Sequence, residues 1–517
     1  MESLYNGIGL PDEWPPRDQH VASLQPMRVP YLENPPEVIP IDLGRQLFLD
    51  DYLIEENWMP RVFHRPVKHP GNPVFVPQTG HERNAELPPC TIPKCGGIWY
   101  DEEACLFKMW YMASYLGYMA YATSTDGIHW DRPELDVVPG TNLILPEDIH
   151  PDSGTVWFDP ESADAAQRYK MLIREPNTSL TGDRFPALLF ASPDGIHWKR
   201  IGETGPMDDR STMFYNPFRR KWVQSIRAWM SPRKRCRLYH EHADFLASGA
   251  WKAGEPVFWT GADCMDESGE APAELYNLDA VAYESLMVGF YQILKGPPND
   301  HGQRVGQPKL TELMLATSRD GFHWHRPDRK AFIGARRETG SWEFGYVEST
   351  GGVLLTVGDE LWFYYSAYAG DHTRLSPDWH INGMYANGAV GLAKLRRDGF
   401  ASLQARFPGA SVTTRLLQFS GKRLFMNANT VGAGLRVECR DVNNQPLPGF
   451  AAADCIPFVG NATSVEIRWK GADLASLAGR PVRFRFQMDR GDLYAFWVTD
   501  AADGDSHGFR GAGGPRG

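Results

Sequence analysis

Acidic side chains stand just before or at the start of several strand-like segments of this 517-residue sequence. They are Asp152 in "HPDSG", Asp209 in "MDDRST", Glu274 in "APAELYNLD" and Glu343 in "GSWEFGY". Two carboxyl groups that flank a scissile bond can divide its cleavage, because one donates a proton while the other, ionised, acts as nucleophile or base. Crowding suits this chemistry, since like charge and partial burial raise the pKa of one carboxyl group. The pattern predicts acid–base chemistry if the fold brings these residues together.

A turn motif that occurs three times indicates how the chain is organised. It reads "TSTDGIHWDRP" at 123–133, "ASPDGIHWKR" at 191–200 and "ATSRDGFHWHRP" at 316–327. Strand-like runs precede each copy, and two further units, at 209–245 and 344–403, contain similar runs without the full motif. Five such units of about 40 to 60 residues, each with four short strands, are typical of the blades of a β-propeller.

The motif itself is interpreted as framework. Asp-Gly forms a tight turn, because glycine tolerates a positive φ and the aspartate side chain accepts hydrogen bonds from nearby backbone amides. The tryptophan that follows is expected to pack between neighbouring blades. The three histidines of the motif, His129, His197 and His323, are therefore expected on the outer rim as framework residues, not as catalytic groups or metal ligands.

The sequence divides into four regions of an all-β protein, a five-bladed β-propeller followed by a β-sandwich. We expect an N-terminal extension at 1–35, the propeller at 36–405, the sandwich at 406–500 and a disordered tail at 501–517. Strand-like pieces between 36 and 80 either lead into the ring of blades or help to close it. The sandwich is expected because the strands of 406–500 alternate in polarity between polar turns. The tail is rich in glycine and poor in apolar residues.

The candidate site is expected in the central funnel, where the first strand of each blade begins. Two arginines, Arg174 and Arg210, are suited to hold a carboxylate ionised or to clamp an anionic substrate. Structural alternatives stand beside the chemical ones: Asp152 caps a turn, Asp209 pairs with its neighbour Arg210, or Glu274 is a solvated surface charge. The residues predicted to bind substrate are Glu86, Arg174, Arg210, Tyr276, Asn277, Asp279 and Trp342.

The five blades, the S/T-x-D-G-x-H-W turn and the C-terminal sandwich resemble the five-bladed-propeller glycoside hydrolases, which include invertase/levanase-like, arabinanase/xylosidase-like and mannoside-phosphorylase families. "RQLFLDDYLIEE" with "RVFHRPVKHPGNPV" further resembles uncharacterised bacterial glycosyl-hydrolase-like proteins. The invertase-type "NDPNG" is absent. In the resembled families Asp, Asp and Glu follow one another on successive blades. This order implies Asp152 as the orienting residue, Asp209 as nucleophile or base and Glu274 as general acid, with Glu343 in reserve.

The sequence therefore predicts a glycoside hydrolase, exo-acting on an oligosaccharide through a pair of funnel carboxylates. One alternative is a glycoside phosphorylase, in which Arg174, Arg210 and Arg227 hold phosphate. The other is a non-catalytic carbohydrate-binding propeller. A carbohydrate is the expected partner in each case, and spacing leaves the oligomeric state open.

Charge, hydropathy and cysteine pattern argue against several other classes of partner. A formal net charge of -11 and a pI of about 5.8 argue against nucleic acid. No apolar run approaches the ~20 residues of a membrane span, and the first residues lack the pattern of a signal peptide, so the protein is expected in the cytoplasm, or in the periplasm or medium if translation starts upstream. Seven cysteines without a C-x-x-C motif and the strand pair His240 and His242 predict no metal site, and no cofactor is expected.

Overall fold

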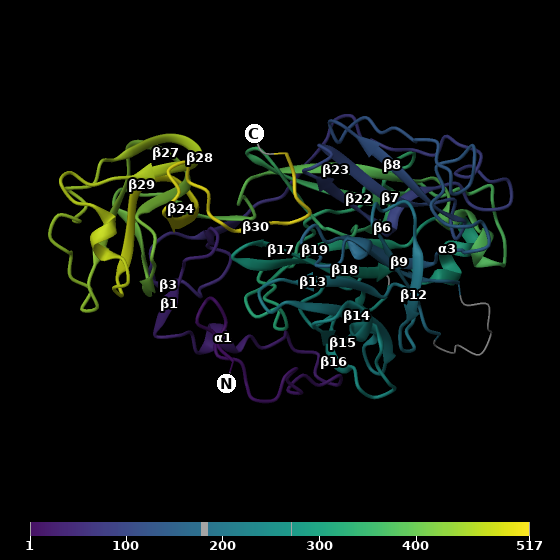
Figure 1. Cartoon of the computed structure of the whole chain (residues 1–517), viewed down its shortest axis with the longest axis horizontal. Helices are drawn as coiled ribbons and strands as arrows, with labels where there is room; N and C mark the ends of the chain where they lie inside the picture. The colour runs from purple at the N-terminus through teal and green to yellow at the C-terminus, as the bar shows by residue number, and fades with distance from the viewer. Residues whose placement is uncertain (1, 177–184, 270, 516–517) are drawn as a thin grey trace.

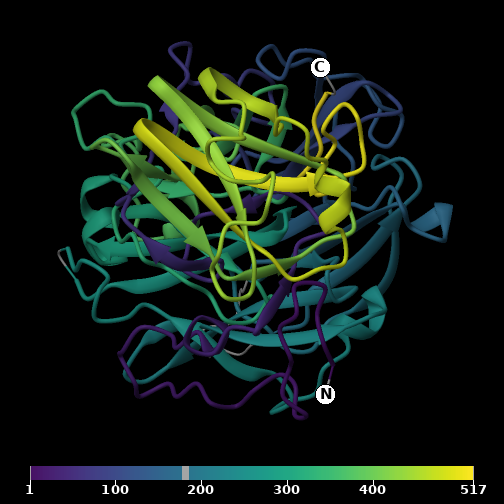
Figure 2. The same cartoon turned by 90° about the vertical axis from the view of Figure 1, so that its left-hand side faces the viewer.

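The computed structural model describes residues 2–176, 185–269 and 271–515, and β-strands form most of its regular structure (Figure 1). Two hydrophobic cores are present, one within a propeller and one within a C-terminal sheet. Figure 2 shows the C-terminal sheet in front of the propeller, so the sheet covers one end of the ring of blades.

The first three blades follow the order expected from the repeats. Each is an antiparallel sheet, and the first strands of blades 1 to 4 contact one another in succession around the central channel. Blade 1 consists of β6 (Thr91–Asp101), β7 (Leu106–Ala113) and β8 (Tyr118–Ser124), blade 2 of β9 (Ser153–Phe158), β10 (Tyr169–Arg174), β11 (Leu188–Ser192) and β12 (Lys199–Glu203), and blade 3 of β13 (Thr212–Asn216), β14 (Lys221–Met230), β15 (Lys234–His242) and β16 (Val257–Gly261).

The last two blades include strands from distant parts of the chain. Blade 4 consists of β17 (Glu274–Glu284), β18 (Leu286–Gly296) and β19 (Leu310–Ser318), and blade 5 of β20 (Gly345–Glu348), β21 (Leu355–Val357), β22 (Glu360–Tyr368), β23 (Gly388–Arg396) and the N-terminal β5 (Val67–Lys68). Because β5 pairs with β23, the N-terminal region supplies the outermost strand of blade 5 and ties the end of the ring to its beginning. The expectation that residues 36–80 help to close the ring is confirmed for β5.

The Asp-Gly motif forms the predicted turn. In its first copy the Asp126 carboxylate accepts hydrogen bonds from the backbone N–H of Ile128 and of His129, both at 2.8 Å, and lies 2.8 Å from His129 Nδ1. Gly127 has a φ of 72°, which glycine adopts without strain. The copies at Asp194 and Asp320 repeat these contacts. The motif histidines are thus engaged within the turns, as expected.

Each Asp-Gly turn is also bonded to the neighbouring blade. The Tyr364 hydroxyl of blade 5 donates to the Gly127 carbonyl at 2.6 Å. Trp110 Nε1 of blade 1 donates to the Gly195 carbonyl at 2.6 Å, and Trp259 Nε1 of blade 3 donates to the Phe322 carbonyl at 2.8 Å. The motif tryptophans Trp130 and Trp324 pack against Tyr364 and Trp259 across the same blade junctions. The repeat therefore joins blades, and its recurring histidines need no catalytic explanation.

The C-terminal sheet also recruits N-terminal strands. The two long strands β27 and β29 form its centre, and β2, β3 and β4 join it although they precede the propeller in sequence. The eight strands are β2 (Gln46–Leu47), β3 (Ile54–Asn57), β4 (Arg61–Phe63), β24 (Ala401–Ala405), β25 (Ala410–Thr414), β27 (Arg423–Arg440), β28 (Phe458–Ile467) and β29 (Arg483–Thr499). Since β24 pairs with β29, this sheet begins before the predicted boundary at 405–406. The division into a two-layer sandwich stays a prediction.

Short elements connect these parts. The N-terminal segment is not a loose extension, because Leu4, Ile8 and Leu10 are buried in the core of the C-terminal sheet. The remaining strands and helices are α1 (Pro30–Glu33), β1 (Val38–Pro40), α2 (Phe245–Gly249), α3 (Asn299–Val305), β26 (Leu416–Gln418), β30 (Phe509–Arg510) and the 3-10 turns η1 (Ala165–Gln167), η2 (Trp379–Ile381), η3 (Gly383–Tyr385) and η4 (Leu474–Leu477). Strand β26 pairs in parallel with β1.

The prediction of a disordered tail at 501–517 is wrong for the residues described, which extend to Pro515. Strand β30 pairs with the end of β17, and the backbone N–H of Ala512 donates to the Leu354 carbonyl at 2.7 Å. The Tyr100 N–H in turn donates to the Ala512 carbonyl at 3.0 Å. The glycine-rich composition suggested disorder, but these residues find their hydrogen-bond partners in strands of blades 1, 4 and 5 that are distant in sequence.

His323 of the third Asp-Gly turn is expected to make stability depend on pH. It is 4% exposed by side chain and lies between Asp320, 2.6 Å from Nδ1, and Asp18, 3.8 Å from Nε2. Burial lowers its pKa, but the two carboxylates outweigh this and raise the pKa to about 9. Because this exceeds the unfolded value of about 6.5, the stabilisation is complete below about pH 6.5 and is lost as the pH rises through 9.

The measurement is the free energy of unfolding by urea from pH 6 to pH 9.5, for the native protein and for His323→Gln. The native protein should lose up to about 3 kcal/mol more than the variant across this range, since one pKa unit corresponds to about 1.4 kcal/mol. Equal pH dependence of the two proteins would contradict the assignment.

Candidate active site

Most of the predicted site residues lie at one end of the propeller, where the first strands of the blades begin. We call this end the funnel and define it as the residues at and just before the starts of β6, β9, β13, β17 and β20. Asp152 directly precedes β9, Asp209 precedes β13, and Glu274 is the first residue of β17. Three successive blades therefore place one acidic residue each at the same end of the channel, as the sequence predicted.

Asp152 is paired with Arg174 of the neighbouring strand β10. The distance from Arg174 Nη1 to Asp152 Oδ2 is 3.3 Å, and the two side chains are 1% and 5% exposed. The pairing follows from the strand register, which sets Ser153 opposite Arg174. Arg174 is therefore engaged by a protein carboxylate, and among the described residues the contact of the Asp152 carboxylate is with this arginine.

Asp209 is paired with Arg227, and the described side-chain contacts of its sequence neighbour Arg210 are with Glu348 and Gln292. Arg227, on β14, lies 3.0 Å from the Asp208 carboxylate and also contacts the Asp209 carboxylate. Burial lowers the pKa of Arg227, an effect that the Asp208 charge opposes. The side chains of Asp208 and Asp209 are 30% and 28% exposed, so this pair of acids faces solvent more than the Asp152 pair does.

Glu274 is paired with Arg235 of β15, at 2.6 Å, and lies 3.7 Å from Lys234. The alternative that Glu274 is a solvated surface charge does not hold, because the residue is 5% exposed. The Arg235 guanidinium also lies 4.9 Å from the centre of the Trp229 ring. Trp229 is 52% exposed, and an exposed indole beside an ion pair suits stacking on a sugar ring.

Trp229 was missed by the sequence reasoning. Its only signal was the position at the end of the strand run "KWVQSIRAWM", where an outward-facing tryptophan cannot be told from a buried one.

A buried ion pair occupies the centre of the channel. The sequence predicted Arg210 as a site residue but not its partner Glu348. Arg210 Nη2 lies 3.0 Å from Glu348 Oε1 on β20 and donates to Gln292 Oε1 at 3.2 Å. Asn277 Nδ2 donates to Asp279 Oδ2 at 2.8 Å. These polar side chains lie deep in the channel and are engaged with one another, so the structure gives Arg210, Asn277 and Asp279 internal partners.

Tyr276, predicted to bind substrate, lies in a cluster of phenols and cations. Its hydroxyl oxygen accepts hydrogen bonds from Lys309 Nζ at 2.8 Å and from the Tyr346 hydroxyl at 3.3 Å. Burial alone would raise the pKa of Tyr276, but the charges of Lys309, Arg235 and Arg227 lower it to about 7.

The pKa of Lys309, the lysine beside Tyr276, is lowered as well. Burial lowers the pKa of Lys309 to about 8, which the nearby Tyr276 partly opposes.

A described segment between β22 and β23 covers the funnel. Its Tyr385 stacks on Tyr115 of blade 1 with ring centres 4.1 Å apart, and the Asn387 N–H donates to the Pro89 carbonyl at 2.7 Å. Tyr115 and Tyr385 are 2% and 3% exposed. Exposure increases toward blade 3, where Asp209 and Trp229 lie, so the funnel is most open to solvent on that side.

Three predicted residues stand before β6 or β20, but their described contacts are not with Asp152, Asp209 or Glu274. Glu343 Oε2 lies 2.8 Å from Lys68 on the outermost strand of blade 5 and accepts from the Tyr365 hydroxyl at 2.8 Å. Trp342 packs on the same Tyr365 with ring centres 5.7 Å apart. Glu86 has an exposed side chain in the loop before β6. These positions resembled the others in sequence, but the start of blade 5 turns Glu343 and Trp342 toward the rim.

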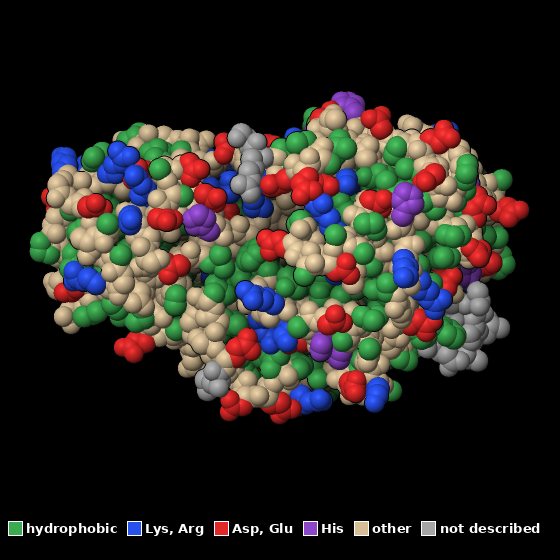
Figure 3. All heavy atoms as spheres, viewed as in Figure 1, with side chains coloured by type: hydrophobic (Ala, Val, Ile, Leu, Met, Phe, Trp, Pro, Cys, Tyr) green, Lys and Arg blue, Asp and Glu red, His purple; other side chains and the backbone are tan. Residues whose placement is uncertain are grey.

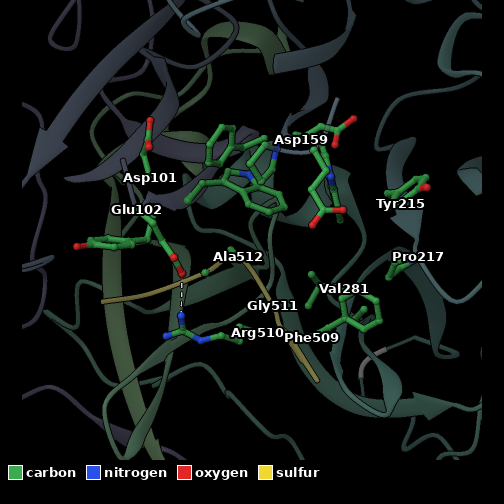
Figure 4. Close-up of a pocket in the computed structure, with 18 of the residues that line it drawn as sticks. Asp101, Glu102, Asp159, Tyr215, Pro217, Val281, Phe509, Arg510, Gly511 and Ala512 are labelled. Carbon is green, nitrogen blue, oxygen red and sulfur yellow. Dashed lines mark hydrogen bonds and ion pairs between the residues drawn. The ribbon is translucent and has the colours of Figure 1, made fainter. Parts of the chain in front are cut away.

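A cavity of about 470 Å³ lies at the opposite end of the channel, where the first strands end (Figure 4). Its walls include Trp99, Phe158 and Val281, and the C-terminal residues Phe509 and Arg510 line one side. The Arg510–Glu102 ion pair at 2.8 Å crosses this wall, as Figure 4 shows. None of the residues predicted to form the site lines it.

The described residues contain no group of three or more His, Cys, Asp or Glu side chains placed to hold a metal ion. Within the described part of the chain, no helix has the length and apolar character needed to cross a bilayer. Acidic and basic side chains are interspersed on the face in Figure 3, and hydrophobic side chains are visible where the C-terminal sheet meets the propeller.

Comparison with solved structures finds glycoside hydrolases, at low identity. A glycosyl hydrolase from Bacteroides ovatus is 13% identical and aligns over 68% of this chain and 97% of its own, with a TM-score of 0.41. A glycoside hydrolase of family 130, a family of mannoside phosphorylases, is 13% identical over 66% of this chain and 96% of its own, with a TM-score of 0.41.

A fructofuranosidase from Schwanniomyces occidentalis, solved with fructosylnystose, is 11% identical over 81% of this chain and 98% of its own, with a TM-score of 0.33. No family model and no curated protein matches the sequence.

Proposed function

We propose that the protein is a glycoside hydrolase that cleaves a sugar from the end of an oligosaccharide in the funnel. The observation that carries the proposal is the placement of Asp152, Asp209 and Glu274 at the same end of three successive blades, with the exposed ring of Trp229 beside the Glu274–Arg235 pair. Carboxylates from different blades can meet the spacing that glycoside cleavage requires, and an exposed indole offers a platform for a sugar ring.

The enclosure of the funnel supports exo action. Tyr115, Tyr276 and Tyr385 are each less than 5% exposed, and the segment that carries Tyr385 lies across the funnel. A site closed on this side and open toward blade 3 admits a chain end more readily than the middle of a polysaccharide. The sugar next to the cleaved bond would then lie near Tyr276, and the rest of the substrate near Trp229.

The carboxylates take different parts in this proposal. Asp209 is the nucleophile or base, because its side chain is 28% exposed and lies where water and substrate enter. Asp152 is buried against Arg174 and orients the substrate or its neighbours. Glu274 is engaged by Arg235 at 2.6 Å, which suits a carboxylate that positions the substrate better than one that donates a proton.

Phosphorolysis is less well supported by the same contacts. Arg174, Arg210 and Arg227, which would have to hold phosphate, lie against Asp152, Glu348 and the Asp208–Asp209 pair respectively. A binding-only propeller remains the alternative from another class, and it predicts affinity for a glycan without turnover.

The test is release of monosaccharide from a panel of natural oligosaccharides and nitrophenyl furanosides and pyranosides, with and without inorganic phosphate. We expect release that does not require phosphate, and on oligosaccharides we expect monosaccharide as the first product. Release only with phosphate would replace hydrolysis by phosphorolysis. Calorimetric binding of a glycan with no release from any member of the panel would favour the binding-only propeller.

A further inference from the structure

The hydrogen bonds around Tyr276 are those of a phenol that can give up its proton. Its oxygen accepts from Lys309 Nζ at 2.8 Å and from the Tyr346 hydroxyl at 3.3 Å. Two donors directed at the oxygen stabilise the phenolate that remains after proton transfer, because hydrogen bonds to a charged acceptor are stronger than those to a neutral one.

Cations surround this phenol on several sides. The Arg235 guanidinium lies 5.1 Å and that of Arg210 5.9 Å from the centre of the Tyr276 ring, and Arg227 of β14 contributes a further positive charge. Lys309 is itself held in place, since its Nζ also donates to Asn299 Oδ1 at 3.0 Å. Positive charge therefore faces Tyr276 from the strands of blade 3 and from the start of β19.

The other titratable groups around Tyr276 are phenols. Tyr346 on β20, Tyr385 in η3 and Tyr115 after β7 are close enough to interact electrostatically with Tyr276, and burial holds the pKa of each well above its usual range. Lys309 also faces Tyr346 and Tyr385. The Tyr276 ring additionally has the guanidinium groups of Arg235 and Arg210, 5.1 Å and 5.9 Å from its centre. The nearby acids Asp152, Asp209 and Glu274 are each engaged by an arginine.

We propose that Tyr276 is the general acid of the funnel, and that it protonates the oxygen of the departing sugar or alcohol. This rests on the proposed glycoside hydrolase function and assigns the proton donor that Glu274, held by Arg235, does not supply. Lys309 is a positioning residue, because it acts on the reaction through the phenolate of Tyr276.

The step balances without a further reactant. The oxygen of a water molecule bonds to the anomeric carbon while its proton passes to the Asp209 carboxylate. The glycosidic bond breaks with its electron pair moving to the leaving oxygen, which takes the proton from the Tyr276 hydroxyl. The phenolate that remains accepts hydrogen bonds from Lys309 and Tyr346. The cycle closes when Tyr276 takes up a proton from solvent and Asp209 releases one to it.

The pKa of Tyr276, lowered to about 7 by Lys309, Arg235 and Arg227 against the effect of burial, places this proton donor near neutral pH. An acid is active only while it is protonated, so kcat/KM should fall as the pH rises through the pKa of Tyr276.

Absorbance titration near 295 nm of the free protein tests the phenol without any substrate. We expect one tyrosine to ionise near pH 7, and this transition should be missing in Tyr276→Phe. In Lys309→Met the transition should move to higher pH, because the ammonium that favours the phenolate is removed. The matched control is Tyr215→Phe, which removes a partly buried phenol from the cavity at the opposite end of the propeller and should leave the transition unchanged.

The dependence on the leaving group tests the catalytic role. Tyr276→Phe should lose about 100-fold to 10,000-fold in kcat/KM on an oligosaccharide, the range of general acid catalysis. The loss should be much smaller on a dinitrophenyl glycoside, whose leaving group departs without protonation, and a purely structural defect would affect both substrates alike.

The outcomes separate this proposal from the proposed function. The role of Tyr276 is overturned, and the hydrolase stays supported, if the enzyme is active but no tyrosine ionises below pH 9. The same conclusion holds if Tyr276→Phe loses equal factors of kcat/KM on both substrates. A transition near pH 7 in a protein without activity on the panel confirms the perturbed phenol but overturns its role as general acid together with the hydrolase. Circular dichroism of each variant verifies that it is folded.

Discussion

Asp209→Asn is expected to lower kcat on the best substrate of the panel by about 100-fold to 10,000-fold, with little change in substrate binding. The reason is that Asn keeps the size of Asp209 but can neither accept a proton from water nor attack the anomeric carbon, and a positioned base contributes a factor of this order. Its contact with Arg227 would also weaken, because the amide carries no charge. The measurement is kcat and KM together with the calorimetric affinity for the reaction product.

Two control variants make this expectation specific. Asp208→Asn changes a neighbouring acid with similar exposure that contacts the same Arg227 at 3.0 Å, so a loss due only to the weakened ion pair would appear in both variants. Asp159→Asn changes an acid in the wall of the cavity at the opposite end of the channel. If Asp159→Asn is inactive and Asp209→Asn is active, the active site has to be assigned to that cavity instead of the funnel.

Arg210→Met is expected to lower the free energy of unfolding of the propeller by about 3 to 5 kcal/mol, the cost of leaving a buried charge without its partner. Glu348 is fully buried and lies 3.0 Å from Arg210 in the centre of the channel. Neither oxygen of Glu348 has a hydrogen-bond donor in ideal geometry among the described residues, so the arginine charge is its main compensation. Urea unfolding at pH 7 measures the effect.

The double variant Arg210→Met with Glu348→Gln should recover part of the lost stability, because the unpaired charge is then removed as well. Arg304→Met serves as the control at an exposed ion pair, that with Asp300 at 3.0 Å, and should cause no measurable change. If the double variant is no more stable than Arg210→Met, the buried charge is not the cause of the loss.

Local sequence patterns determined the blades. The Asp-Gly turn depends on contacts between residues at most three positions apart, such as those of Asp126 with the N–H groups of Ile128 and His129. The strand runs before it alternate in polarity for the same local reason, and together they predicted an all-β five-bladed propeller and the framework role of the motif histidines. They also placed Asp152, Asp209 and Glu274 at strand starts, hence at one end of the channel.

Closure of the ring and the ends of the chain were decided by pairings between distant segments. Strand β5 completes blade 5 and β30 pairs with β17, although neither short segment has a strong strand pattern of its own. The tail was predicted to be disordered because its composition offers few apolar residues. Its stability comes instead from backbone hydrogen bonds to strands that only the folded propeller brings near.

The partners of the charged residues were likewise decided only by the tertiary structure. Asp209 stands next to Arg210 in sequence, yet it contacts Arg227, while Arg210 crosses the channel to Glu348. Glu343 has the same local setting as the funnel acids but pairs with Lys68 at the rim of blade 5. The sequence by itself determined which residue types stand at the starts of strands. Packing between blades decided which of them face the channel, because the direction of a side chain there depends on how each strand is twisted against its neighbours.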